Sequence, residues 1–474
     1  MRNRIKHINL LVWVVACLIW QVISIVRIEN PELRDMAALR ILILICSFGL
    51  SLTFSNKNII FSILTILGAT QAFYAIVQQI GIAESNHIMF NVTGFMGNPG
   101  QLGGFQSVAL MSALFLLQDT HGKTLSYRAV LISASLIISY SLFLADSRAA
   151  FLSCIFGAFI LYQRQFYDFI KCHKWFIYLA VIITIIGCIS IFFYRPNSAL
   201  ARLLIWRVCT DMIADNPFCG HGTLGFNSSY MLYQADFFLN HPDSIFIQVA
   251  DNAAYPYNEF LHILVEQGFV GLFLFLMVLL SACIKASDFR QTAPLVSLLI
   301  FSFFSYPSYK LPLAILFPIH IGVLFPHSEK PFLNKVHIWI PLILLCIGVM
   351  TAQQLNNRQH RYYQGINIIS EDTISSLLPT CENWCNIGEY YLHENDHITA
   401  RKYLKQAALM IPTRVRPNYL LWKSYIETND ITKAQQIGRH ILTQPIKVEN
   451  TFTLRAKKEI KDWFAYTQSI AIFV

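Results

Sequence analysis

The chain has 474 residues, of which 55% are hydrophobic and only 13% are charged. Soluble proteins carry about 25% charged residues, so this composition excludes a water-soluble globule. Of the formal net charge of +9, the tail after residue 354 carries +4, and the rest lies largely in the short segments between long apolar stretches, which argues against a nucleic-acid binder.

The long apolar stretches predict membrane helices. A helix that crosses the hydrocarbon of a bilayer needs about 20 mostly apolar residues. The first stretch follows basic residues like a signal peptide, but it is longer than an h-region and has no small-residue cleavage site, so we expect an uncleaved anchor. The sequence predicts eleven spans, near residues 8–27, 37–54, 58–80, 101–118, 127–145, 149–163, 175–194, 259–284, 292–306, 309–325 and 337–353.

The distribution of Lys and Arg predicts the orientation. With the N-terminus inside, thirteen of them fall in cytoplasmic loops and eight in the much longer outside loops of the membrane part, as the positive-inside rule expects. Parity then places the polar loop of about residues 195–258 and everything after residue 354 on the outer face. The eleven cysteines are scattered and form no CxxC pair, so we expect neither a disulfide framework nor a metal site.

The tail shows a repeat of 34 residues. Trp384, Ile387, Gly388 and Tyr391 fit the first half of the tetratricopeptide pattern, and Ala400, Leu404 and Pro412 fit the second. Tyr391, Asn395, Asp396 and Ala400 recur as Tyr425, Asn429, Asp430 and Ala434. We expect two helix pairs, capped by helices near 358–378 and 452–468, that bind a partner or stiffen the membrane part.

These patterns predict an all-α protein with two parts. Residues 1–353 form a polytopic membrane bundle of about eleven helices with a large outward loop, and residues 354–474 form a soluble tetratricopeptide-like domain. Cys381 and Cys385, one helical turn apart in that domain, are expected to be a structural thiol pair, because no His completes a set of metal ligands.

Few polar residues are expected on the outer face at membrane depth, and such residues are functional candidates. The loop of residues 94–100, which contains Asn98, is rich in turn residues, and it also begins a helix whose free N–H groups suit an anion. Both interpretations stay open.

Three outward arginines come from two separate segments. Arg148 follows Asp146 in a short hairpin, and Arg202 and Arg207 lie on either side of Trp206. An ion pair or contact with lipid headgroups explains each one singly. Together, on the cation-poor side, they favour a shared anion site, because the guanidinium fork suits phosphate.

Candidate proton acceptors also lie on the outer side. The outward histidines are His221, His241 and His262, each of which is more often structural than catalytic. Glu259 and Glu266 are seven residues apart and therefore share one helix face.

Taken in order, these stretches resemble the O-antigen ligase and polymerase superfamily of bacterial envelope glycosyltransferases. The motifs that carry the resemblance are Gly94-x-x-Gly97-Asn98-Pro99, Ser147-Arg148-Ala149-Ala150, Arg202-x-x-Ile205-Trp206, Met212-Ile213-x-Asp215-x-Pro217-x-x-Gly220-x-Gly222, Asn258-Glu259-x-Leu261 and Glu266-x-Gly268-x-x-Gly271. The tail is similar to a repeat-bearing subgroup from Bacteroidetes-type bacteria, in Met410-Ile411-Pro412 and Pro417-x-Tyr419-Leu420-Leu421.

The resemblance implies a C-type glycosyltransferase architecture in the bacterial inner membrane, with the C-terminal domain in the periplasm. It implies an inverting transferase that needs no metal or other cofactor. The donor is a glycan on undecaprenyl diphosphate. The acceptor is lipid A-core in ligases, another repeat unit in polymerases, or a protein hydroxyl in related oligosaccharyltransferases.

The resemblance also assigns roles to residues. Arg148 and Arg202, and then Arg207, are expected to stabilise the leaving diphosphate. The family commonly has a His as base just before the Asn of the Asn-x-x-Leu motif, where this sequence has Tyr257. His221, Glu259 and Glu266 are therefore candidate bases, in that order. The expected substrate-binding residues are Asn98, Trp206, Tyr257 and Asn258.

Three alternatives stay open at this stage. A repeat-unit polymerase or protein transferase shares the same motifs. A non-enzymatic envelope scaffold would act through the repeats and their protein partner, but has no need of Arg148, Arg202 and Arg207 near lipid headgroups. A transporter is less favoured, because charged residues within the spans are few.

Overall fold

The computed structural model describes residues 10–28, 30–54, 56–87, 89–120, 124–172, 175, 196–325, 339–363, 374 and 377–473. Every regular element in these residues is helical, which confirms the expected all-α class for them. The chain divides into two compact units, and each is described by itself. Unit 1 comprises residues 1–187 and 257–356, and unit 2 comprises residues 188–256 and 357–474.

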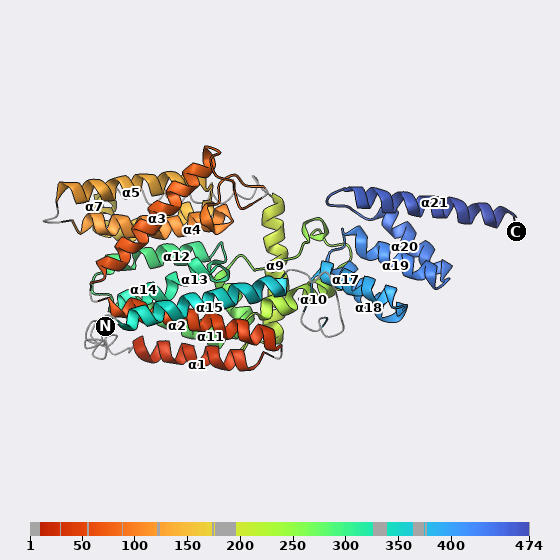
Figure 1. Ribbon diagram of the computed structural model, residues 1–474, viewed down its shortest axis with the longest axis horizontal. Helices are drawn as coiled ribbons and strands as arrows, with labels where there is room; N and C mark the ends of the chain where they lie inside the picture. The colour runs from red at the N-terminus through yellow and green to blue at the C-terminus, as the bar shows by residue number, and fades with distance from the viewer. Residues whose placement is uncertain are drawn as a thin grey trace. The chain divides into compact units, whose positions relative to one another are not determined.

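Unit 1 is a bundle of apolar helices (Figure 1). Its elements are α1 (Leu10–Val26), α2 (Pro31–Thr53), α3 (Asn58–Gln79), η2 (Gly94–Met96), α4 (Pro99–Gln118), α5 (Leu125–Leu144), α6 (Arg148–Leu161), α7 (Gln163–Cys172), α11 (Glu259–Lys285), η4 (Phe289–Thr292), α12 (Ala293–Ser302), η5 (Pro307–Tyr309), α13 (Leu311–Ala314), α14 (Leu316–Leu324) and most of α15 (Trp339–Tyr363).

Helix α4 lies at the centre of this bundle. It is predominantly apolar, with only a few buried polar residues, as expected of a buried helix, and 83% of its apolar window is buried. It packs against α3, α5, α6 and α12. Small residues allow the close approach: a Cβ at Gly103 would lie 2.7 Å from the Cβ of Ser147, at the start of α6. Because Met111 likewise meets Gly157, α4 and α6 run parallel and begin at the same end.

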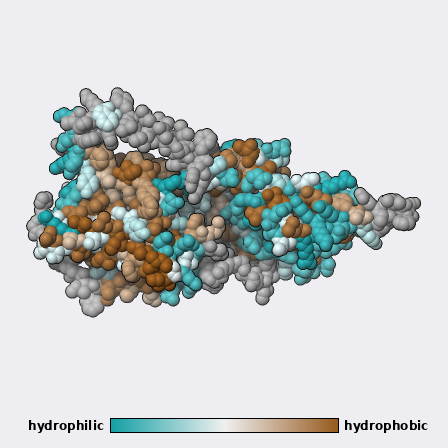
Figure 2. All heavy atoms as spheres, turned by 90° about the horizontal axis from the view of Figure 1, so that it is seen from above, coloured by the Kyte–Doolittle hydropathy of each residue, from teal (hydrophilic) through white to brown (hydrophobic). Residues whose placement is uncertain are grey.

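The surface of unit 1 suits a bilayer. Large apolar side chains stand exposed on several of its helices, for example Val22 on α1, Ile66 on α3 and Phe143 on α5, and Figure 2 shows hydrophobic residues gathered over this unit and mostly hydrophilic ones over the C-terminal helices. Exposed apolar surface of this extent marks contact with lipid. The protein is therefore a multi-pass membrane protein.

The described residues include six helices that are long and apolar enough to cross a membrane, within α2, α3, α4, α5, α11 and α15, and three shorter apolar ones. The predicted total of eleven spans thus stays a prediction. The expected span at 175–194 lies outside the described residues except for residue 175. The expected span at 309–325 is divided into α13 and α14.

Helix α11 is kinked at Gly268, whose φ of 64° and ψ of −169° interrupt the helix. Glycine adopts this conformation without a Cβ clash. A kink inside a bilayer frees backbone groups that need new partners. Trp20 Nε1 donates to the freed carbonyl of Gln267 at 3.3 Å, and Gln21 Nε2 donates to the Gln267 side chain at 2.7 Å. The two residues of α1 thereby hold the kink.

Unit 2 combines the polar loop before α11 with the C-terminal tail. Its elements are α9 (Pro196–Asp215), α10 (Gly225–Asn240), η3 (Ile247–Val249), α17 (Cys381–His393), α18 (His397–Met410), α19 (Val415–Glu427), α20 (Ile431–Thr443) and α21 (Thr451–Phe473). The predicted domain boundary near residue 354 stays a prediction. The cap expected near 358–378 lies largely outside the described residues.

The 34-residue sequence repeat is also a structural repeat. Helices α17 and α18 begin 34 residues before α19 and α20. Asn395 and Asn429 both adopt positive φ, of 60° and 59°. The next residues, Asp396 and Asp430, cap α18 and α20 by accepting hydrogen bonds from the backbone N–H three residues on, as N-cap residues do. Membership of the tetratricopeptide family stays a prediction.

The charge of Asp251 stabilises unit 2. Burial raises its pKa, but Lys447 at 2.8 Å, the N–H of Asn252 and Arg414 at 3.3 Å outweigh this effect and hold the pKa below its ordinary value. A lowered pKa in the folded state gives stability that is present above the unfolded pKa of about 3.9 and is lost as the pH falls through the folded value.

We therefore expect Asp251→Asn to lower the stability of unit 2 at pH 7 by up to about 1 kcal/mol for each of these half-exposed pairs. The difference from wild type should vanish as the pH falls below about 4. Thermal unfolding in detergent at several pH values measures the loss of stability and its dependence on pH. A difference that persists undiminished in acid would contradict the role of this charge.

Candidate functional site

The start of α11 carries a strained aromatic residue beside its cap. Asn258 caps the helix, since its Oδ1 accepts from the N–H groups of Phe260 and Leu261, each at 3.0 Å. Tyr257 before it has a φ of 55°, which is unfavourable for a residue with a Cβ. The rings of Tyr257 and Tyr306 meet edge to face at 5.3 Å. Asn258 therefore has a structural role as the N-cap of α11.

Glu259 and Glu266 lie on one face of α11, as predicted, and both turn toward His262. The imidazole Nδ1 lies 3.2 Å from Glu259 Oε1, and Nε2 lies 2.9 Å from Glu266 Oε1. All three residues are at most 5% exposed. A base must reach the proton it removes, and this burial makes the two carboxyl groups less accessible than the sequence suggests.

A second layer ties this cluster to the segment between α12 and α13. Ser308 donates its backbone N–H to Glu259 Oε2 at 3.2 Å, and its hydroxyl lies 3.3 Å from His262 Nδ1. The ring of Tyr309 covers His262 at 4.7 Å. Arg40 of α2 donates to the Ser308 carbonyl at 2.5 Å. These partners of His262 could not be predicted from the sequence, because they lie far from it in the chain.

The loop of residues 93–98 is held by α3. Gln78 Oε1 accepts from the N–H groups of Thr93 and Gly94 at 3.0 and 2.8 Å, and Gln71 Oε1 accepts from Phe95 N–H at 3.0 Å. The two glutamines are seven residues apart and so share one helix face. The side chains of Gln71 and Gln78 thus accept the backbone hydrogen bonds that a helix or sheet would otherwise accept. They hold the loop in the conformation that leads into α4.

Asn98 and Gln101 occupy the first turn of α4. Asn98 Oδ1 caps the helix by accepting from Gly100 N–H at 2.8 Å. The Gln101 side chain is 1% exposed, and neither its Oε1 nor its Nε2 has a hydrogen-bond partner in the described part of the chain. Helical side chains lean toward the N-terminus, so this amide points to the end of α4 where N–H groups are unpaired. An unsatisfied buried amide is unusual and calls for a partner.

Arg148 lies beside this end of α4. It is the first residue of α6, which runs parallel to α4 and meets it at Ser147 and Gly103. Arg148 is exposed, and the described residues offer it no ion pair or hydrogen bond. Arg148 does not form the local ion pair with Asp146 that would explain its charge. One end of unit 1 therefore contains the N-termini of α4 and α6, together with the guanidinium of Arg148 and the side-chain amide of Gln101, both unpaired within the described residues. This arrangement favours a bound anion.

Helix α9 of unit 2 carries the other two candidate arginines on different faces. Arg202 is half-buried and shares a face with Trp206, whose Nε1 donates to the Pro256 carbonyl at 2.9 Å. Arg207 is exposed and pairs with Asp211 at 3.0 Å. Trp206 thus anchors the end of the loop, and Arg207 has a local counter-ion.

His221 lies half-buried between α9 and α10. Its Nε2 is 2.8 Å from the Met212 carbonyl, which only accepts, so Nε2 is the donor in this contact. The ring contacts Tyr233 edge to face at 5.5 Å. Burial, and then the hydrogen bond to Asp215 at 2.6 Å, raise the pKa of Tyr233, so this phenol stays protonated.

No group of three or more His, Cys, Asp or Glu side chains within the described ranges has the geometry to hold a metal ion. Cys381 and Cys385 are buried and form no disulfide.

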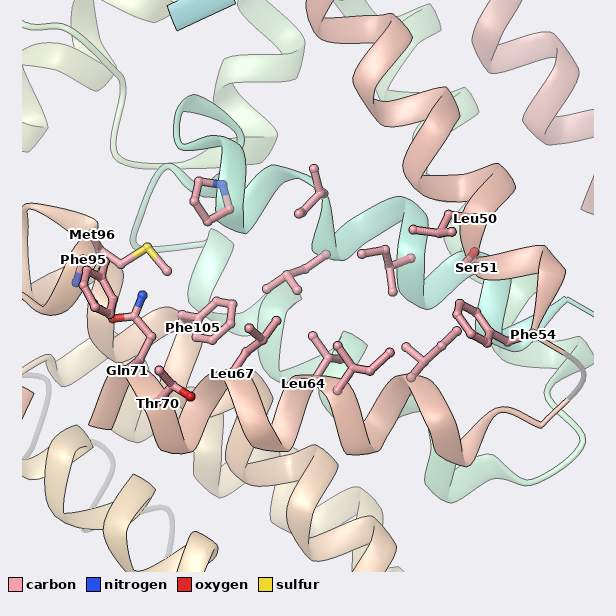
Figure 3. Close-up of a pocket in the computed structure, with 16 residues that line it drawn as sticks. Leu50, Ser51, Phe54, Leu64, Leu67, Thr70, Gln71, Phe95, Met96 and Phe105 are labelled. Atoms are coloured by element: carbon pink, nitrogen blue, oxygen red, sulfur yellow. The ribbon is translucent and has the colours of Figure 1, made fainter. Parts of the chain in front are cut away.

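An apolar groove of about 370 Å³ lies between α2, α3, α13 and α14. Figure 3 shows Leu64 and Leu67 of α3 lining it, with Gln71, Phe95 and Met96 at one end. It therefore runs along the bundle from an apolar region to the loop before α4.

We expect Gly94→Ala to disturb this site more than Gly97→Ala. Both glycines have positive φ, of 57° and 71°, so both changes introduce backbone strain. A Cβ at Gly94 would also lie 2.5 Å from Gln71 Oε1 and 2.9 Å from Leu102 Cδ1, whereas nothing lies within 4 Å at Gly97. Gly94→Ala should lower the free energy of unfolding by about 2–3 kcal/mol and Gly97→Ala by about 1 kcal/mol. Equal losses in thermal unfolding would contradict the proposed fit of the loop.

Comparison with known families gives one match. The family model described as O-antigen ligase matches residues 107–276. This region contains all six candidate catalytic residues, whereas Asn98 and Gln101 precede it. No curated protein and no solved structure matches the chain.

Proposed function

We propose that this protein transfers a glycan from undecaprenyl diphosphate to an acceptor hydroxyl at the periplasmic face of the bacterial inner membrane. The O-antigen ligase match over residues 107–276 carries the proposal. It covers the stretch from Arg148 to Glu266 that holds the candidate catalytic residues, in a chain with several membrane helices.

The reaction places strict demands on the site. The acceptor oxygen attacks the anomeric carbon and forms the new glycosidic bond, while the bond from that carbon to the lipid diphosphate breaks. The attack occurs from the opposite side, so the configuration inverts. The acceptor proton passes to a base, and the negative charge grows on the leaving diphosphate. Fixed positive groups aimed at that charge lower the barrier.

The end of unit 1 where α4 and α6 begin supplies such groups. Arg148 offers two parallel N–H donors to phosphate oxygens. The Gln101 amide offers a donor that the described residues leave unused, and both helix dipoles favour negative charge. We assign the leaving diphosphate to this end of unit 1, and the resemblance to the family gives Arg202 and Arg207 the same role. A donor amide held in advance costs no reorganisation during the reaction.

His221 is the preferred base. Its Nδ1 lone pair is available once Nε2 donates to the Met212 carbonyl, whereas Glu259 and Glu266 are buried against His262. Tyr257 is a weak base, because a phenol has an ordinary pKa of about 10. Tyr257 and Trp206 are assigned to substrate contacts through their aromatic faces.

The groove of Figure 3 suits the hydrocarbon of a lipid-linked donor. Its lining is apolar, and its outer end meets the loop that leads to α4. A long chain in the groove would place the attached diphosphate near the helix N-termini.

Product identity tests the proposal and separates its alternatives. Purified protein is incubated with lipid-linked glycan and, separately, with lipid A-core, a serine-containing periplasmic protein or additional donor. Transfer to lipid A-core supports a ligase, longer glycan a polymerase, and modified protein an oligosaccharyltransferase. Transfer should persist in EDTA. If no acceptor yields a product, the result would favour the scaffold alternative and refute the proposed transferase activity.

A further inference from the structure

The C-terminal repeats contact the loop before α11 through a shared core. Helix α10 of the loop packs against α18 of the first repeat and against α9. Its buried residues include Phe226, Tyr230 and Phe238, which are at most 2% exposed. A helix buried on this scale depends on its neighbours for stability.

A buried amide joins three segments at this core. Gln234 is 1% exposed. Its Oε1 accepts from Tyr230 at 2.8 Å, and its Nε2 donates to the carbonyls of Met410 at 2.6 Å and Asp251 at 3.3 Å. These bonds link α10, the end of α18 and the end of the loop. A buried polar group that is satisfied in this way specifies one arrangement.

Two further residues of the loop bind the repeats at the surface. Asp251 pairs with Arg414, just before α19, and with Lys447, after α20. Asn252 Oδ1 accepts from Cys381 N–H at 3.3 Å, at the start of α17. The loop is thus attached to the beginning or end of each repeat helix pair.

The same loop holds the arginine-bearing helix. Trp206 of α9 donates to the Pro256 carbonyl, and Asn227 of α10 donates to the Ala254 carbonyl at 3.0 Å. Tyr233 of α10 donates to Asp215 at the end of α9. A shift of α10 or of residues 251–256 therefore moves α9.

We infer that the C-terminal repeats act as an internal brace, which holds α10 and residues 251–252 and so positions the arginine helix α9. Gln234 is a positioning residue in this arrangement. The repeats serve the transfer reaction from within the chain, rather than only by recruiting another protein. The catalytic consequence rests on the proposed function, whereas the structural coupling does not.

Hydrogen exchange on the full-length protein in detergent tests the coupling. Gln234→Met keeps the length of the side chain and removes its hydrogen bonds, and Asp251→Asn weakens the surface contact. Glu389→Gln is the matched control, because Glu389 pairs with Arg416 at 2.7 Å wholly within the repeats. We expect amides of α10 and α9 to exchange about tenfold faster in Gln234→Met, more modestly faster in Asp251→Asn, and unchanged in the control.

Transfer assays on the same variants test the consequence. We expect kcat to fall with Gln234→Met while the amounts of inserted and folded protein stay at the wild-type level, and to stay unchanged with Glu389→Gln. Unchanged exchange in α9 and α10 of both loop variants would overturn the brace. Faster exchange in a protein whose wild type transfers no glycan would support the brace and refute the proposed function.

Discussion

Replacing Arg148 by Ala is expected to reduce glycan transfer by about 100-fold to 1,000-fold, the usual cost of losing one preorganised donor to a developing charge. Arg148 is exposed at the start of α6, beside the start of α4, and has no ion-pair partner among the described residues. Its loss therefore removes no stabilising contact of the fold. The measurement is kcat for transfer from lipid-linked glycan, with membrane insertion checked in parallel.

Two variants sharpen the test of Arg148. Arg148→Lys keeps the charge but lacks the planar fork, so it should recover only part of the activity. Arg128→Ala is the matched control: Arg128 is also exposed, but it lies near the other end of α5 and donates to the Thr120 carbonyl. Transfer at the wild-type rate by Arg148→Ala would refute the role of Arg148 in stabilising the leaving diphosphate. Arg202→Ala should reduce transfer to a similar extent without loss of insertion.

Replacing His262 by Leu should have the largest effect on stability. The imidazole stands between the carboxyl groups of Glu259 and Glu266, and all three side chains are nearly inaccessible. Removing one partner of a buried pair costs about 3–5 kcal/mol, because the remaining charge stays buried. We expect a matching loss in the free energy of unfolding in detergent.

The neighbouring Ser308 provides the control for His262. Ser308→Ala removes one hydroxyl contact to Nδ1 and keeps the backbone N–H bond to Glu259, so it should cost about 1 kcal/mol. Adding Glu266→Gln to His262→Leu should restore part of the lost stability, since coupled residues are not additive. If His262→Leu unfolds like the wild type, the cluster does not stabilise α11.

Local patterns in the sequence predicted much of the architecture. The apolar stretches of α2, α3, α4, α5 and α11 were found from length and composition alone. The repeat was found from the alignment of Asn395 and Asp396 with Asn429 and Asp430, which the structure confirms as equal turns and caps. Each of these features is decided within one turn or one helix, where propensity and hydropathy act directly.

The candidate site was predicted in part. The sequence identified Arg148 and the loop around Asn98 as candidates, but not Gln101, whose missing partner appears only when its burial is known. It ranked Glu259 and Glu266 as bases without the contacts that bury them. Arg40 and Ser308 are 268 residues apart and share a hydrogen bond, which no periodicity reveals.

The sequence by itself therefore determined that this is a helical, multi-pass membrane protein with a repeat-bearing tail. Only the tertiary structure decided which polar groups are paired, buried or left without a partner, and that the loop before α11 and the tail share one core. The reason is physical. Hydropathy and capping are properties of neighbouring residues, whereas the partner of a buried amide, carboxyl or guanidinium group is set by segments that meet only after folding.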